Sequence, residues 1–98
     1  MINRNLSIQL EEVFKVYNND YANKILNLLD QNLKGLNVNE IASRLKISQP
    51  YCSLMLNKLK KHNLVIVVSN KTKRLHTINK STVERIDKFS EMWNNYVK

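Results

Sequence analysis

Residues 36–53, LNVNEIASRLKISQPYCS, contain the clearest signals for the fold of this chain. Asn37 is a residue type that caps helices, and Glu40 follows three positions later, which is the spacing of a capping box. The apolar residues after this cap recur at helical spacing, so the sequence predicts a short helix with one buried face: Val38, Ile41, Ala42 and Leu45.

A second helix is predicted after the turn Lys46-Ile47-Ser48. Ser48 can cap it, and Pro50 is tolerated in its first turn because a backbone N–H there has no intrahelical partner. Asn63 is the non-glycine residue best able to take the left-handed conformation that ends a helix. The stretch therefore indicates two helices joined by a tight turn.

Toward the N-terminus, the spacing of apolar residues predicts two further amphipathic helices. The first runs from about Ser7 to Asn18. The second has Asp20 as its cap and ends at Gly35, the single glycine of the chain, because helix ends favour a left-handed glycine. Its apolar stripe consists of Ala22, Ile25, Leu26, Leu28, Leu29 and Leu33.

Toward the C-terminus, Leu64–Ser69 and Arg74–Asn79 are predicted strands joined by a polar turn. Ser81-Thr82-Val83-Glu84 has the spacing of a capping box, so it opens a last helix that reaches almost to Lys98. Two helices with a tight turn, followed by a basic hairpin, describe a winged helix-turn-helix. The expected fold is mainly α with a small β-hairpin, and residues 1–98 form one domain.

The positive charge of the chain, +8 over 98 residues, is concentrated in its middle. No acidic residue lies between Glu40 and Glu84, whereas nine basic residues do: Arg44, Lys46, Lys58, Lys60, Lys61, Lys71, Lys73, Arg74 and Lys80. Such a segment repels itself, and a polyanionic partner relieves the repulsion. Double-stranded DNA is the leading candidate partner, and a lysine-rich solubilising surface is the alternative.

The helix after Ser48 has the residues of a recognition helix. With Cys52, Leu56 and Leu59 turned inward, an exposed Leu54 suits thymine methyl groups, and side-chain amides suit adenine. We expect an A·T-rich site to be read by Gln49, Tyr51, Ser53, Leu54 and Asn57. We expect Ser48, Lys58 and Lys61 to hold phosphates, and Arg44 is also counted among the DNA-binding residues. The alternative for each is an ordinary solvated position.

The hairpin carries Lys71, Lys73 and Arg74 near its tip. Long cationic side chains there can follow the DNA backbone or enter a narrow minor groove. The hairpin is therefore expected to act as a wing.

Residues 36–53, with their continuation through Leu59 to Asn63-Leu64-Val65, resemble the helix-turn-helix of the ArsR-type (arsenic repressor-like) winged-helix regulators. The resemblance extends through the hairpin and covers most of the chain. It implies a homodimeric transcriptional repressor that leaves its DNA operator when an inducer binds.

The inducer site of many such regulators has no counterpart in this sequence. Where members of the family carry a Cys-x-Cys pair at the start of the third helix, this chain has Asn37 and Asn39, which excludes thiolate ligation there. The carboxylates of the last helix, Glu84, Asp87 and Glu91, come without a histidine and suggest a solvated face. We therefore expect no metal and no cofactor, and Cys52 is expected to be a small core residue.

The first and last helices each carry an apolar stripe beyond what the central core needs, and we expect residues 7–18 and 82–97 to form a homodimer interface. An intramolecular use of these stripes is the alternative. A dimer would place two recognition helices about 34 Å apart and so predicts an inverted-repeat operator. The interface residues are expected to be Leu6, Leu10, Val13, Phe14, Tyr17, Ile86, Phe89, Trp93 and Tyr96.

Other functional classes fit the sequence less well. A single glycine excludes a glycine-rich phosphate loop, and no catalytic pairing is evident, so an enzyme is not expected. The longest apolar run, Leu64–Val68, is far shorter than a membrane span, and one cysteine suits a reducing compartment, so a cytoplasmic protein is expected. A winged-helix module for protein or RNA, and a ligand-independent MarR-like or phage regulator, remain as alternatives.

Overall fold

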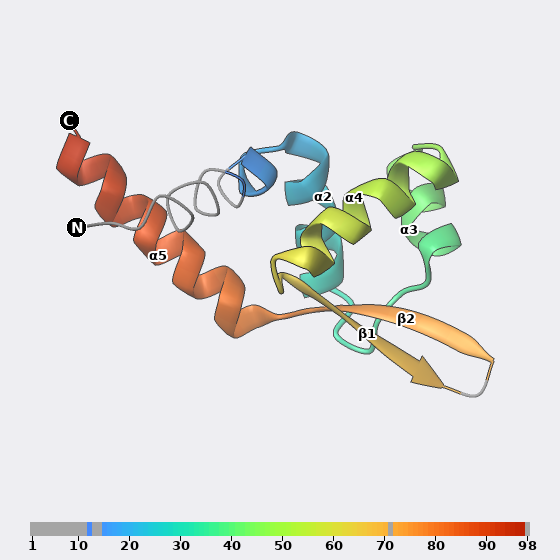
Figure 1. Ribbon diagram of the computed structural model, residues 1–98. Helices are drawn as coiled ribbons and strands as arrows, with labels where there is room; N and C mark the ends of the chain where they lie inside the picture. Colours follow the sequence, from blue (N-terminus) through green and yellow to red (C-terminus); the bar gives the residue numbers. More distant parts are fainter. Residues whose placement is uncertain (1–11, 13–14, 71, 98) are drawn as a thin grey trace.

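The computed structural model describes residue 12, residues 15–70 and residues 72–97. Its elements follow the order expected from the sequence (Figure 1): α2 (Asp20–Asp30), α3 (Val38–Leu45), α4 (Gln49–Lys61), β1 (Val65–Asn70), β2 (Lys73–Ile78) and α5 (Lys80–Val97). Residues 15–17, which precede α2, are also helical. A mainly helical chain with one antiparallel two-stranded hairpin is a winged helix-turn-helix, which confirms the predicted fold class.

The start and end of α2 differ from the prediction. Its N-cap is Asn19, whose side-chain oxygen accepts hydrogen bonds from the backbone N–H groups of Tyr21 and Ala22, and Asp20 is already helical. The helix ends at Asp30, five residues before Gly35. Leu33, predicted on the apolar stripe, lies beyond the helix and is 63% exposed.

The helix-turn-helix has the predicted caps. Asn37 and Glu40 form a reciprocal capping box at the start of α3, and the Ser48 hydroxyl accepts the N–H of Tyr51 at the start of α4. Asn63 has a φ of 62°, as expected for the residue that turns the chain after α4. Lys46 also adopts a left-handed conformation, which the sequence did not predict for a lysine.

The hairpin is tied to the helical body by the loop before α3. Leu36 forms a β-bridge with His76, with backbone N–O distances of 2.8 and 3.1 Å. Gly35 has a φ of +100°, and a Cβ there would lie 3.0 Å from side-chain atoms of both Leu75 and Thr77. Glycine is therefore needed here for close approach of the loop to β2, not to end α2.

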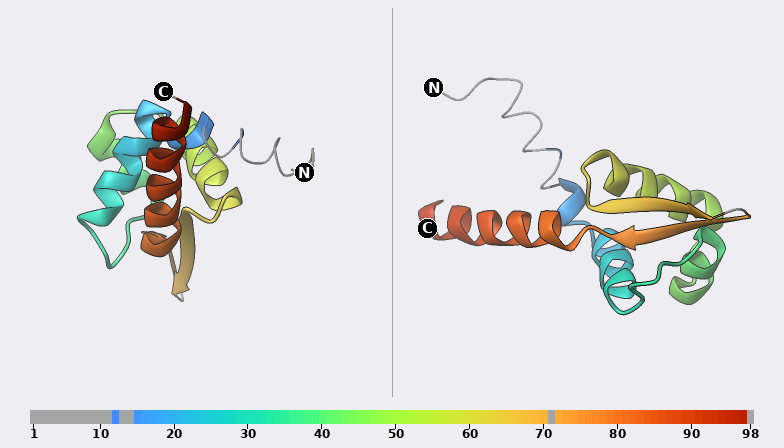
Figure 2. Two further views of the ribbon diagram at one scale, coloured as in Figure 1. Left: turned by 90° about the vertical axis from the view of Figure 1, so that its left-hand side faces the viewer. Right: turned by 90° about the horizontal axis from the view of Figure 1, so that it is seen from below.

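The last helix begins one residue earlier than its predicted cap. Asn79, not Ser81, accepts the N–H of Thr82, and α5 starts at Lys80. Figure 2 shows α5 running away from the body formed by α2, α3 and α4. None of the helices in the described part of the chain is long and apolar enough to cross a membrane.

The core lies between α2, α3, α4 and the start of β1. Cys52, Leu56 and Leu59 of α4 are buried as predicted, and Met55 joins them on the same side. The largest fully buried side chains come from all four elements and from the residue before β1: Ile25, Leu29, Ile41, Leu56, Leu59, Leu64, Val65 and Cys52. One face of α4 is thereby fixed inward, which leaves the opposite face to solvent.

Candidate nucleic-acid interface

The outer face of α4 is exposed, as a recognition helix requires. Leu54 is 51% exposed although it is flanked on the helix by the buried Cys52 and Leu56. Gln49, Pro50 and Asn57 are also exposed. The helical angle predicted this arrangement correctly, because residues at 100° intervals divide α4 into an apolar side and a solvent side.

Two of the predicted DNA-binding residues lie on the flank of α4 that faces α2. Tyr51 is partly buried against the core, and its ring meets that of Tyr21 edge-to-face with 5.6 Å between centroids. Lys58 is exposed and lies beside Val16 and Asn19 at the edge of a hollow. Tyr51 therefore contributes packing between α2 and α4, which reduces the ring surface available to a base.

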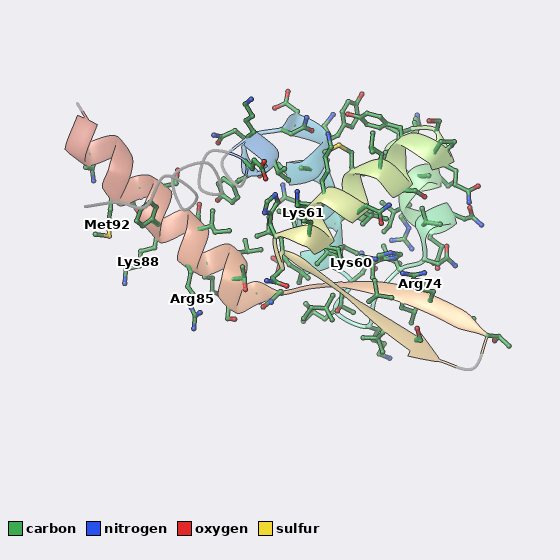
Figure 3. All side chains as sticks on the ribbon, viewed as in Figure 1. Lys60, Lys61, Arg74, Arg85, Lys88 and Met92 are labelled. Carbon is green, nitrogen blue, oxygen red and sulfur yellow. The ribbon has the colours of Figure 1, made fainter. Side chains whose placement is uncertain are left out.

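The other flank of α4 faces the hairpin. Ser53, Asn57 and Lys60 are spaced by four and three residues and so share one stripe of the helix. A hollow of about 260 Å³ separates this flank from β2, and Ser53, Asn57, Arg74 and His76 are among the residues that line it. In Figure 3, Lys60 and Arg74 lie between α4 and the hairpin.

The cations of the predicted interface differ in whether the protein already provides a partner for them. Lys61 forms an ion pair with Glu12 at 3.6 Å, and Arg44 donates a hydrogen bond to Asn32 at 3.4 Å. Within the described part of the chain, the following have neither a hydrogen-bond nor an ion-pair partner: Lys58, Lys60, Lys73 and Arg74. Unpaired cations beside an exposed helix face are suited to binding a polyanion. Ser48, a predicted phosphate contact, uses its hydroxyl as the α4 cap, and Lys71 lies outside the described residues.

His76 is the one buried polar side chain in the core region that the structure describes. Its Nδ1 lies 3.4 Å from the carbonyl oxygen of Leu36. Burial lowers the pKa of His76 below its usual value, the hydrogen bond to Leu36 opposes this shift, and the charges of Arg74 and Lys60 lower the pKa further. His76 is therefore held neutral at the edge of a cationic surface.

Cys52 and the carboxylates of α5 do not form a reactive or metal-binding site within the described residues. Cys52 is fully buried, and burial raises the pKa of its thiol, so the thiolate is disfavoured. Among the described residues, no group of three or more His, Cys, Asp or Glu side chains is arranged to hold a metal ion.

The predicted dimer interface is described only in part. Leu6, Leu10, Val13 and Phe14 lie outside the described residues, as do the side chains of Trp93 and Tyr96. On α5, Ile86 packs partly against the core, whereas Phe89 and Met92 are 44% and 62% exposed. Tyr17 lies against α5 of its own chain, where its hydroxyl donates a hydrogen bond to Asp87.

Sequence reasoning missed two residues beside the hollow, Lys60 and His76. Lys60 is one of the basic residues of the middle segment but is not among those predicted to bind DNA. Its position seven residues after Ser53 places it on the hairpin-facing stripe. His76 shares a hairpin face with Arg74, since their partners across the hairpin are Val67 and Ser69. Strand alternation could have revealed that His76 lies beside the hollow, if the register of the hairpin had been known.

The sequence of the helix-turn-helix matches a known protein family. Residues 22–67 match the model of the bacterial regulatory protein, arsR family. This match covers α2, α3, α4 and the start of β1, which are the elements that form the core and the exposed face of α4. No curated protein sequence matches this chain.

Solved structures reproduce the fold over nearly the whole length of the chain. The homodimeric winged helix-turn-helix DNA-binding domain of Mb0332 from Mycobacterium bovis, a possible ArsR-family transcriptional regulator, has a TM-score of 0.73 at 21% identity, covering 100% of this chain and 92% of that one. HlyU from Vibrio cholerae has a TM-score of 0.65 at 24% identity, covering 94% and 98%. MepR of S. aureus in complex with DNA has a TM-score of 0.65 at 16% identity, covering 90% and 74%. The chain is therefore a winged helix-turn-helix protein, and residues 22–67 of it match the model of the bacterial regulatory protein, arsR family.

Proposed function

We propose that this protein is a transcriptional repressor that binds an A·T-rich inverted repeat in double-stranded DNA as a homodimer. The observation that carries the proposal is the outer face of α4, where Leu54 is exposed between residues of the core and unpaired cations lie on both flanks. An exposed apolar side chain among polar neighbours suits the thymine methyl groups of a major groove. A similar fold bound to DNA, that of MepR, supports this interpretation.

In this proposal, exposed residues of α4 read the bases. Gln49 has the amide that pairs with adenine, and Leu54 contacts thymine methyl groups. Lys58 and the hairpin cations Lys73 and Arg74 supply the electrostatic part of the affinity, which does not depend on base sequence. Lys61 and Arg44 contribute less, because Glu12 and Asn32 already interact with them.

The proposed dimer uses α5 and the segment before α2. The last turns of α5 extend beyond the helical body (Figure 2), and the exposed Phe89 and Met92 lie on that extension. Apolar and aromatic surface is typical of homodimer interfaces. The homodimeric state of the similar Mb0332 domain supports the same arrangement. In this proposal the protein has no catalytic activity, and it acts in the cytoplasm, where duplex DNA is its partner.

Selection of bound sites from random duplexes tests the proposal. We expect enrichment of two A·T-rich half-sites in inverted orientation, with centres about 34 Å apart, one turn of the duplex. Enrichment of a single half-site would contradict the dimer, and no enrichment at all would contradict specific DNA recognition. Competition by unlabelled single strands or RNA as effective as that by the duplex would instead support an RNA-binding module.

Two variants sharpen this selection: Leu54→Ala is the test variant, and Lys88→Ala is its control. Leu54→Ala removes the exposed apolar group from α4, so we expect it to weaken the preference for A·T half-sites. Lys88 projects from α5 away from α4 in Figure 3, so its replacement should leave the selected sequence unchanged. Sedimentation at micromolar protein concentration tests the dimer separately from DNA binding.

A further inference from the structure

The hollow between α4 and β2 has a lining that suits an anion. Ser53 and Asn57 reach it from α4, Arg74 and His76 reach it from β2, and Val38 and Leu56 supply its apolar part. The side chains of Ser53, Asn57 and Arg74 have no hydrogen-bond or ion-pair partner within the part of the chain that the structure describes. Three polar side chains from two elements thus converge on one space without being satisfied by the protein.

The charge around the hollow is uniformly positive. Arg74 from β2 and Lys60 from α4 are the charged groups whose fields reach His76, and both lower its pKa. The loop before α3 contributes the Leu36 carbonyl, and α3 contributes the apolar Val38. Among the described residues that line this hollow, none is acidic.

We propose that this hollow seats one phosphate group of the DNA backbone, with Arg74 and Lys60 supplying the charge and Ser53 and Asn57 donating hydrogen bonds to its oxygens. The proposal rests on DNA binding and adds to it a defined phosphate contact. It also changes the role of two residues: Ser53 and Asn57, expected from the helical angle to read bases, position the backbone instead. The phosphate fixes the hairpin relative to α4 on the duplex.

His76 reports on the occupancy of the hollow. In the free protein, burial and the charges of Arg74 and Lys60 keep the imidazole neutral. A phosphate in the hollow offsets those two charges, so the charged imidazole becomes less unfavourable and the pKa of His76 rises on binding. Linkage then requires that DNA binding take up protons from solvent and that affinity increase as the pH falls through the range of this titration.

The test follows the pKa of His76 by NMR in the free full-length chain and in complex with a duplex of unrelated sequence. We expect the pKa to be higher in the complex. A second arm adds inorganic phosphate alone at low salt: a rise with phosphate identifies a site that also takes the free anion, whereas a rise with duplex alone assigns the phosphate to the DNA backbone. An unchanged pKa in the presence of both, while the duplex binds, overturns the proposal.

Variants separate this phosphate contact from other charges of the hairpin. Arg74→Ala and Asn57→Ala are expected to weaken binding to selected and unrelated duplexes by the same factor, about tenfold or more for Arg74, since charge-assisted hydrogen bonds are the stronger ones. The matched control is Lys73→Ala, which removes one charge from the adjacent position on the opposite hairpin face. In that variant the pKa of His76 should still rise on binding.

Two outcomes distinguish the failure of this proposal from the failure of DNA binding. If Asn57→Ala changes the preference between duplexes but not the affinity for unrelated ones, Asn57 reads a base and the phosphate assignment is wrong. If the wild-type protein binds no duplex, the proposed function is wrong, and the phosphate in the hollow cannot come from a DNA backbone.

Arg74→Lys keeps the positive charge at this position, so this variant should retain part of the affinity for duplex DNA.

Discussion

The hairpin end and the α5 end of the molecule differ in how the protein compensates its charges. At the hairpin end, Lys60, Lys73 and Arg74 have no hydrogen-bond or ion-pair partner within the described residues. At the start of α5, Lys80 pairs with Asp30 at 3.4 Å, and the hydroxyl of Tyr17 donates to Asp87. Lys60, Lys73 and Arg74 thus lack a protein partner on the surface proposed to meet DNA, whereas contacts within the chain are made at the start of α5. Further along α5, Arg85 and Lys88 also have no ion-pair partner within the described residues, but they project away from α4 (Figure 3).

This difference has an energetic consequence. Like charges held close together destabilise the folded state by mutual repulsion, and a bound polyanion relieves that repulsion. The pairs near α5 are exposed, so each contributes little to stability. The hairpin end is therefore expected to carry the salt dependence of binding, and the packed core is expected to carry the stability.

The largest predicted effect concerns the core beneath the hairpin end. Leu56→Ala should lower the free energy of unfolding by about 2–5 kcal/mol, because it removes a side chain that is 2% exposed and leaves a cavity. Its matched control is Leu54→Ala, two residues away on the outside of the same helix, which should change stability by less than about 0.5 kcal/mol. Urea denaturation of both variants measures this; equal losses would contradict the division of α4 into two faces.

The next prediction concerns the salt dependence of duplex binding, which is compared between two double variants of equal net charge. Lys60→Ala/Arg74→Ala should flatten the log–log salt dependence of duplex binding by about 0.9, the value for the single phosphate that these two side chains hold together. Arg85→Ala/Lys88→Ala should leave it unchanged, because these side chains project from α5 away from α4 (Figure 3).

The same two double variants carry an internal check. Arg74 and Lys60 both lower the pKa of His76, so the first double variant should raise that pKa in the free protein, and the second should not. Equal salt slopes in the two variants would show that the distinction between the two ends does not govern binding.

The pH dependence of stability tests whether His76 is buried and neutral. Its pKa in the folded state lies below the usual value of 6.5, so the unfolded chain binds more protons at acidic pH. The free energy of unfolding should therefore fall as the pH drops through 6.5 toward the folded-state value, by no more than about 1.4 kcal/mol per pH unit. Urea denaturation between about pH 7.5 and about pH 5.5 measures this. A slope that is the same in His76→Gln would assign the effect to other groups.

The smallest effect is expected at the α5 end. Tyr17→Phe removes the hydrogen bond to Asp87 and should lower the free energy of unfolding by about 1 kcal/mol. Burial, with the hydrogen bond to Asp87 and the charge of Asp87, raises the pKa of Tyr17 to about 12, so this group favours the folded state below its usual pKa of 10.0. Spectrophotometric titration of the phenol checks the pKa. Duplex affinity should not change in Tyr17→Phe. A loss of affinity would show that the α5 end and the hairpin end are coupled.

The helix caps show where sequence reasoning succeeds and where it chooses a neighbouring residue. The capping box of Asn37 and Glu40 and the cap at Ser48 are confirmed, because spacing and residue type both point to one position. The caps predicted at Asp20 and Ser81 are wrong by one and two residues, and an asparagine takes each place, Asn19 and Asn79. Adjacent residues of similar capping ability differ little in local energy, so the packing of the helix decides between them.

The order of helices and strands, the inward face of α4 and the concentration of positive charge can all be predicted from the amino-acid sequence, because spacing, capping and composition are local properties. The packing of the folded chain brings Ser53 and Asn57 opposite Arg74 and His76 across one hollow. The same packing requires glycine at position 35, where a loop approaches β2. Those contacts join residues about twenty to forty positions apart, and their geometry depends on how the hairpin packs on α4. No local pattern records that packing, since it arises from burial of the whole core.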